Sequence, residues 1–158
     1  MAKPSHIHVR PLEIADFVFV QELASKQPNF TIPSTYVLWL LLRIKGAVCL
    51  IAETPEEGPI AYLLAVPVEA PTESLFVWQM ASIAKVRKQG SLSLLKVLKD
   101  LAHERKVETI SFSAEPQSAA YRLIRQYTNK LVARVPQLSF ALPFVVAPRE
   151  SEYRVNLH

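Results

Sequence analysis

Apolar residues recur at helical spacing in the first third of the chain. In EIADFVFVQELAS they fall mostly three or four positions apart, the spacing that predicts an amphipathic helix. These positions are Ile14, Phe17, Val18, Val20, Leu23 and Ala24. A second, shorter apolar helix is predicted in PSTYVLWLLLRI, where Ser34 is placed to cap the first turn. Trp39, on this second helix, is expected in the core.

The middle of the chain reads as strands. GAVCLIAE and PIAYLLAV are apolar runs of strand length separated by TPEEG, a turn signal, so they should form a hairpin. IHVRPL is predicted to be a short first strand that ends at Pro11. ESLFVWQMASI is predicted to be a long strand.

The segment after this long strand carries a leucine stripe. In SLSLLKVLKDLAHERK the apolar side of the predicted helix holds Leu94, Leu95, Leu98, Leu101 and Ala102. VETISFSA then reads as a strand, PQSAAYRLIRQYTNK as a helix, and VPQLSFALPFVV and EYRVNLH as two last strands. The order β-α-α-β-β-β-α-β-α-β-β indicates a mixed α/β or α+β fold built on one sheet.

Composition adds little to this picture but excludes some classes of protein. The 158 residues are 50% hydrophobic and 20% charged, which excludes a largely disordered chain. With no internal repeat or flexible linker, residues 1–158 are expected to form a single domain. The net charge of +4 is too small to indicate a polyanionic partner by itself.

The cysteine count and the hydrophobic stretches bear on location. Cys49 is the only cysteine, so the chain can form no internal disulfide, which suits a reducing cytoplasm. The N-terminal MAKPSHIHVRP has no apolar signal core. The most hydrophobic stretch, residues 36–52, is interrupted by Arg43, Lys45 and Gly46 before it reaches spanning length. We therefore expect a soluble, cytoplasmic protein with no membrane span.

VRKQGSLSLL joins the long strand to the leucine-rich helix, and it is the main candidate for chemistry. The first amides of a helix have no internal acceptor and carry partial positive charge, so this junction suits a pyrophosphate. Gly90 would let the backbone turn and approach such a ligand closely. The alternative is an ordinary solvated loop, because Gly, Ser and Lys are common in any such connection. The basic and hydroxyl side chains here are Lys85, Arg87, Lys88, Ser91 and Ser93.

This junction and the order of the elements resemble the GNAT superfamily of acyl-CoA-dependent N-acetyltransferases. The family loop reads Arg/Gln-x-x-Gly-x-Gly/Ala ahead of a leucine-rich helix; here Arg87 and Gly90 match, and Leu92 stands where Gly or Ala is usual. The resemblance implies a single mixed, mainly antiparallel sheet flanked by about four helices. It also implies acetyl-CoA as co-substrate, with no metal.

The resemblance carries over to particular positions. Backbone amides around residues 88–92 would hold the CoA pyrophosphate, and the strand at Met80 would pair with the pantetheine arm. The residues implied for CoA are Met80, Ala81, Ser82, Arg87, Lys88, Gln89, Gly90, Ser91, Leu92, Ser93 and Gln117. Trp78 and Tyr36 are implied for the acceptor pocket, and the alternative for both is a place in the core.

Longer stretches are similar to the diaminobutyrate acetyltransferases of ectoine synthesis: SLFVWQMA, STYVLWLLL, EPQSAAYRLIRQY and ESEYRVNL. The substrate end departs from that pattern. Those enzymes carry a polar LDLNS ahead of the helix that starts at Ser34, whereas this chain has NFTIPS, with Thr31 and Pro33 at the polar positions. We therefore expect the acceptor to be a primary amine of a small molecule other than diaminobutyrate, larger or less polar.

No catalytic side chain can be named from the sequence. Many family members have a Tyr general acid where this chain has Ile124, which cannot donate a proton. Carboxylates near strand ends would act as a base only through water, and each is more commonly a solvated surface group; they are Glu53, Glu73 and Glu115. The histidines, His6, His8, His103 and His158, lack metal-ligand spacing, so no metal site is expected.

Two other functions stay open at this stage. A catalytically degenerate relative, acting as a CoA-binding sensor or interaction module, is suggested by Leu92 and Ile124. A nucleic-acid binder would use the basic residues Lys85, Arg87, Lys88, Lys96, Lys99, Arg105 and Lys106. No aromatic platform is interleaved with these charges, so no nucleic-acid partner is expected. The apolar run LSFALPFVV allows a homodimer through the late strands.

Overall fold

The structure is a computed structural model that describes residues 6–28, 30–68, 74–107, 109–114, 122, 138–140 and 151–156. Contacts divide the chain into two compact units. The first is Met1–Val66 with Gln79–Leu98, and the second is Pro67–Trp78 with Lys99–His158. The strand β4 (Ser74–Ser82) and the helix α3 (Arg87–Glu104) each contribute residues to both units. The single-domain expectation is not tested by this division and stays a prediction.

The first unit contains the predicted hairpin. Strand β1 (His8–Pro11) pairs antiparallel with β2 (Val48–Thr54), and β2 pairs antiparallel with β3 (Gly58–Val68). The turn between β2 and β3 has Gly58 at a φ of 69°, a left-handed conformation that glycine adopts without steric cost. The hairpin prediction and the first strand ending at Pro11 are both confirmed.

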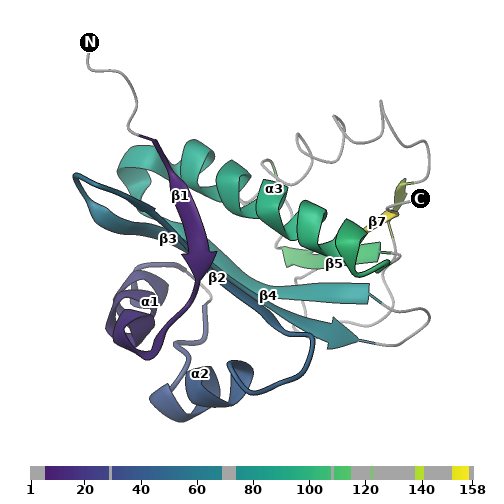
Figure 1. The fold of residues 1–158 in the computed structure, drawn as a ribbon, viewed down its shortest axis with the longest axis horizontal. Helices are drawn as coiled ribbons and strands as arrows, with labels where there is room; N and C mark the ends of the chain where they lie inside the picture. The colour runs from purple at the N-terminus through teal and green to yellow at the C-terminus, as the bar shows by residue number, and fades with distance from the viewer. Residues whose placement is uncertain are drawn as a thin grey trace. The chain divides into compact units, whose positions relative to one another are not determined.

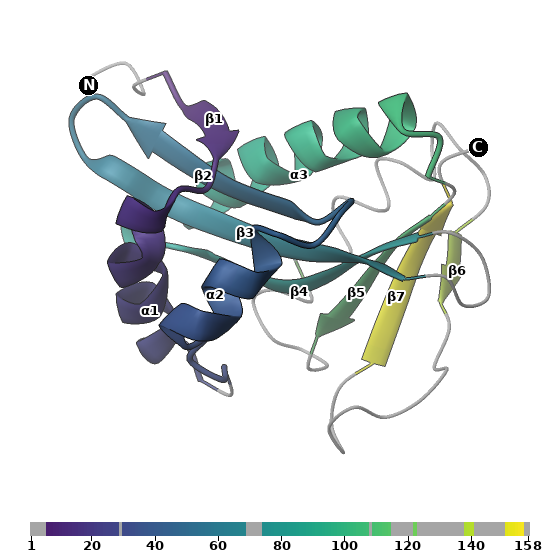
Figure 2. The same cartoon turned by 60° about the horizontal axis from the view of Figure 1, so that its bottom comes forward.

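Two helices lie between β1 and β2 in sequence. A 3₁₀ turn (Ile14–Asp16) leads into α1 (Phe17–Ser25), whose buried positions are Phe17, Val20, Leu23 and Ala24. Helix α2 (Thr35–Leu41) begins as predicted, because the Ser34 hydroxyl accepts a hydrogen bond from the Val37 amide at 3.1 Å. Figure 2 shows both helices on one side of the β2–β3 hairpin, with the first part of α3 on the other side.

Strand β3 is the centre of the first unit. Its residues Ile60 to Ala65 are all fully buried, which requires cover on both faces because successive side chains of a strand point to opposite sides. On α3 the predicted leucine stripe is confirmed in this unit, since Leu94, Leu95 and Leu98 are buried. Figure 1 shows the hairpin between α3 and the pair α1 and α2.

The second unit has a mixed sheet. The first half of β4 pairs parallel with β5 (Thr109–Ala114), β5 pairs antiparallel with β7 (Ser151–Asn156), and β7 pairs antiparallel with β6 (Leu138–Phe140). Apart from Arg122, which is helical and exposed, the helix predicted in PQSAAYRLIRQYTNK lies outside the described residues. Three of the roughly four expected α-helices are therefore described. None of the helices in the described part of the chain is long and apolar enough to cross a membrane.

An ion-pair network joins β1, the 3₁₀ turn and β2. Arg10 donates from Nη1 and Nη2 to the two carboxylate oxygens of Asp16, each at 2.8 Å, and its Nε lies 3.1 Å from Glu53. Asp16 also accepts from the Glu13 amide at 2.8 Å, and only 5% of Asp16 is exposed. Burial raises the pKa of the Asp16 carboxyl, but the hydrogen bonds from Arg10 and Glu13 outweigh burial and leave that pKa below its ordinary value.

Replacing Asp16 tests this network. Asp16→Asn should lower the free energy of unfolding at neutral pH by about 1.5–3 kcal/mol, the range for hydrogen bonds to charged groups. A depressed folded pKa gives stability that is present above the unfolded value, about 3.9, and is lost as pH falls through the folded value. The gap between wild type and variant, measured by urea denaturation, should therefore close in acid.

Glu57→Gln is the matched control, because Glu57 pairs with Lys85 at 2.7 Å on the surface, where ion pairs add little. It should leave the stability unchanged at every pH. Equal stability of wild type and Asp16→Asn at neutral pH would contradict the role given to this carboxylate.

Candidate functional site

The prediction of a loop at residues 87–91 is wrong, because these residues form the first turn of α3, which begins at Arg87. The chain reverses earlier, in a 3₁₀ turn over Ala84–Val86. The amide of Ile83 donates to Ile60 at 2.9 Å, and that of Val86 donates back to Ile83 at 3.2 Å, so four residues suffice for the connection. Apart from the glycine, the residues after the turn are tolerated in a helix, and the packing of α3 then decides the outcome.

Gly90 makes this packing possible. It is buried, and a Cβ placed on it would lie 2.7 Å from the Ser82 hydroxyl oxygen and 3.2 Å from the Ala61 Cβ. Its φ is not in the left-handed region, where Gly46 and Gly58 lie. The glycine is therefore needed for the close approach of α3 to β3 and β4, and the turn that the sequence suggested for it is not observed.

The helical first turn also changes which amides lack an acceptor. In an α-helix each N–H bonds to the carbonyl four residues earlier, so the amides of Gly90, Ser91 and Leu92 are engaged within α3. The amides of residues 87–89 have no acceptor inside the helix. The amide of Arg87 closes the 3₁₀ turn over Ala84–Val86, so of the amides predicted for the pyrophosphate, 88–92, only those of Lys88 and Gln89 stay without an acceptor in the helix.

The polar side chains at this helix start differ in availability. Lys88 is exposed, whereas Lys85 is paired with Glu57 at 2.7 Å. The Ser93 hydroxyl donates to the Gln89 carbonyl at 2.8 Å, and Ser91 is buried. Lys88 is therefore the described side chain here best placed to attract an anion, since hydroxyls that serve their own helix offer little to a ligand.

The last residues of β4 divide between the two faces of the sheet. Ser82 faces α3, where its hydroxyl lies near the position of a Gly90 Cβ. Met80 shares the parity of Ser82 and is half-buried, while Ala81 and Gln79 alternate with them and are buried. The strand thus presents Met80 and Ser82 on the face that carries the start of α3.

Gln79 is a buried polar residue whose structural role the sequence did not reveal. Its Oε1 accepts from the Tyr62 hydroxyl at 3.0 Å, and its Nε2 donates to the Thr31 carbonyl at 2.6 Å. The available signal was an amide at an inward position of the apolar run LFVWQMA, with a tyrosine inside PIAYLLAV. Sequence spacing cannot pair two such residues, because their contact depends on the strand register.

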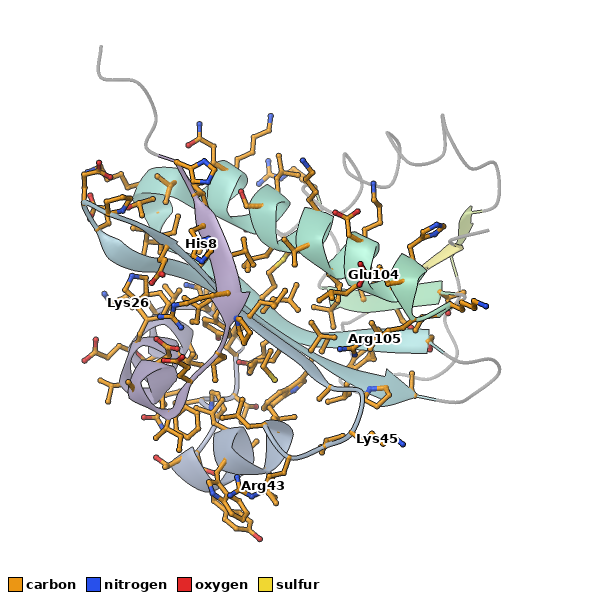
Figure 3. All side chains as sticks on the ribbon, in the orientation of Figure 1. His8, Lys26, Arg43, Lys45, Glu104 and Arg105 are labelled. Atoms are coloured by element: carbon orange, nitrogen blue, oxygen red, sulfur yellow. The ribbon has the colours of Figure 1, made fainter. Side chains whose placement is uncertain are left out.

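The aromatic residues of α2 are exposed, so the core placement predicted for Trp39 is wrong. Trp39 is 37% exposed and Tyr36 67% exposed; their rings stack with centroids 6.0 Å apart, and the Arg43 guanidinium lies 3.8 Å from the Trp39 ring centre. Leu38 and Leu41 occupy the inward side of this short helix instead. Figure 3 shows Arg43 on the side of α2 away from the strands.

The remaining candidates among the described residues differ in their surroundings. Glu53 is paired with Arg10 at 3.1 Å, and burial raises the pKa of the Cys49 thiol to about 11. Trp78 is half-buried and His103 is exposed. In the same described ranges, no three His, Cys, Asp or Glu residues come together as a metal site. The candidates from the sequence analysis that lie outside the described residues are Glu73, Glu115, Gln117, Ile124 and His158.

Comparison with known proteins finds similarity at the level of structure. No protein-family model matches the chain, and no curated protein matches it significantly. The diaminobutyrate acetyltransferase from Paenibacillus lautus, solved with diaminobutyric acid and coenzyme A, is 22% identical with a TM-score of 0.76, covering 96% of this chain and 95% of that one.

Two further structures share the fold at lower identity. The ribosomal-protein-S18-alanine N-acetyltransferase from Escherichia coli is 15% identical with a TM-score of 0.68, covering 96% of this chain and 94% of that one. A protein from Desulfovibrio desulfuricans assigned to the GNAT family of acetyltransferases is 15% identical with a TM-score of 0.69, covering 97% and 100%. The chain therefore has the GNAT fold, as the resemblance implied.

A double-mutant cycle tests the packing at Gly90. Gly90→Ala should lower the free energy of unfolding by about 1 kcal/mol, because overpacking costs about 1–3 kcal/mol and removing a helical glycine returns up to about 1 kcal/mol. In a Ser82→Ala background the 2.7 Å contact is removed and the Ala61 Cβ at 3.2 Å remains, so the same change should cost less. Chemical denaturation of the four proteins measures the coupling; an equal cost in both backgrounds would contradict the packing role.

Proposed function

We propose that this protein is an N-acetyltransferase that moves an acetyl group from acetyl-CoA to the primary amine of a small molecule. The observation that carries the proposal is the start of α3: the amides of Lys88 and Gln89 have no acceptor in the helix, the Lys88 side chain is exposed, and only four residues separate α3 from the end of β4. This arrangement occurs within a fold that the chain shares with acetyltransferases.

The described residues fit a diphosphate-bearing ligand. The main-chain amides of Lys88 and Gln89 would bind the phosphates, with charge supplied by Lys88. Gly90 allows the helix start to lie close to β4, because it has no Cβ and a Cβ at this position would contact Ser82. The main chain of Met80 to Ser82 would hold the acyl arm beside the strand. When bound, acetyl-CoA supplies an acetyl group already activated as a thioester.

Catalysis in this proposal depends on positioning. Holding an amine beside an activated acyl group removes most of the entropic barrier, so few side chains need to react. Glu53, the described member of the three carboxylates that the sequence offered as a base, is engaged by Arg10, which argues against a role as base. The amine would then lose its proton to water, and activity should rise with pH as the free amine forms.

The acceptor end favours a less polar amine than a diamino acid. Thr31 and Ile32 are exposed and uncharged, and Pro33 follows them. Such a surface offers no charged partner to a carboxylate or a second ammonium. Tyr36 and Trp78 remain the predicted contacts of the acceptor, and Tyr36 is open to solvent as such a contact must be.

Lys88→Gln tests the binding part of the proposal. The variant keeps a polar side chain, one atom shorter than lysine, and removes its charge, so isothermal titration should show acetyl-CoA binding weakened about three- to tenfold, equivalent to about 1 kcal/mol. Lys96→Gln, an identical charge change at an exposed position two turns further along α3, should bind as wild type does. Equal affinity of the two variants, or no heat at millimolar acetyl-CoA with wild type, would overturn the assignment of this site.

Thiol release across a panel of amines tests the activity. We expect release with monoamines and less than a tenth of that rate with 2,4-diaminobutyrate, given the uncharged segment ahead of α2. Tight acetyl-CoA binding with no release from any amine would instead support a non-catalytic CoA-binding protein. This proposal predicts no gel shift with nucleic acid. A salt-sensitive shift would instead support the nucleic-acid binder named as an alternative.

A further inference from the structure

Two glutamine amides hold the segment that connects α1 to α2. Residues 30–34 have no regular secondary structure, so their carbonyls need partners from elsewhere. The Gln79 side chain donates to the Thr31 carbonyl at 2.6 Å, and the Gln21 side chain donates to the Pro33 carbonyl at 3.1 Å. The first of these bonds joins the segment to β4.

The Gln79 link is fixed in orientation. Gln79 is 5% exposed and Tyr62 is fully buried. The Tyr62 hydroxyl donates to Gln79 Oε1 at 3.0 Å, so the amide nitrogen of Gln79 must face Thr31. Burial raises the pKa of the Tyr62 hydroxyl, which keeps it protonated as a donor. A buried amide held at both ends has no alternative hydrogen-bond arrangement, so the link is stiff.

The link connects two parts of the candidate site. Gln79 directly precedes Met80 to Ser82, the strand residues that the proposed function assigns to the acyl arm. Thr31 and Ile32, at the other end of the link, are exposed. We infer that Gln79 is a positioning residue: it fixes residues 30–34 relative to β4 as the wall that receives the acceptor amine. This inference rests on the proposed function for the identity of the reaction and on the two hydrogen bonds for the link itself.

Gln79→Met tests the inference, because methionine keeps the length and approximate volume of the side chain and removes the amide. Tyr62→Phe leaves the Gln79–Thr31 bond possible but unoriented, so it should have a weaker effect in the same direction. Gln27→Met is the matched control: Gln27 Nε2 also donates to a carbonyl, that of Leu23 at 3.2 Å, but this acceptor belongs to α1 and not to residues 30–34.

The first measurement is hydrogen exchange at Val37 and Leu38. Their amides bond to the Ser34 hydroxyl at 3.1 Å and the Ser34 carbonyl at 3.0 Å, so they report on the end of the segment. Exchange at both should rise about tenfold or more in Gln79→Met, less in Tyr62→Phe, and not in Gln27→Met. Unchanged exchange in Gln79→Met and Tyr62→Phe would overturn the link, whether or not the protein is an acetyltransferase. If Gln79→Met does not fold, Tyr62→Phe decides.

The second measurement is steady-state kinetics with the best amine. Gln79→Met should raise KM for the amine about five- to tenfold and leave KM for acetyl-CoA within about twofold, with Gln27→Met unchanged. An equal rise in both KM values, or none, would overturn the positioning role. Absence of both acetyl-CoA binding and turnover in wild type would instead reject the proposed function, and exchange at Val37 and Leu38 would still decide whether the link exists.

Discussion

The close packing of α3 against β3 and β4 at Gly90 is the constraint on which the candidate site depends. A Cβ built on Gly90 would lie 3.2 Å from the Ala61 Cβ, so the absence of that atom lets the helix pack closely on β3. Leu94, Leu95 and Leu98 then bury completely on the following turns. The connection from β4 to α3 is then only four residues long, so the first amides of the helix follow the strand end closely.

Two neighbouring residues of strand β3 make the important contacts on its two faces. Ala61 lies under Gly90 on the α3 face, and Tyr62 reaches Gln79 on the opposite face. A small residue permits helix contact on one side, and a long polar one completes a buried hydrogen-bond chain on the other. The start of α3 and the 30–34 segment, which form the two ends of the candidate site, therefore both depend on contacts made by β3.

Two described ionisable groups that the sequence offered as candidates are paired with other side chains. Glu53 completes the Arg10 network, and Lys85 pairs with Glu57. The groups that remain for the candidate site are main-chain amides and side chains that position other groups. Such groups carry no residue-type signature, so a site built from them leaves no recognisable motif in the sequence.

The sequence by itself determined the element order as far as β5, the β2–β3 hairpin, the Ser34 cap and the leucine stripe of α3, because each depends on local spacing or on one capping side chain. Tertiary structure alone decided the start of α3, the exposure of Trp39 and the partner of Gln79. The first depends on how closely a glycine lets two elements approach, and the second on which side of a seven-residue helix meets the sheet. The third requires β3, β4 and a loop about fifty residues away in sequence to meet at one buried point, and no local pattern encodes such a meeting.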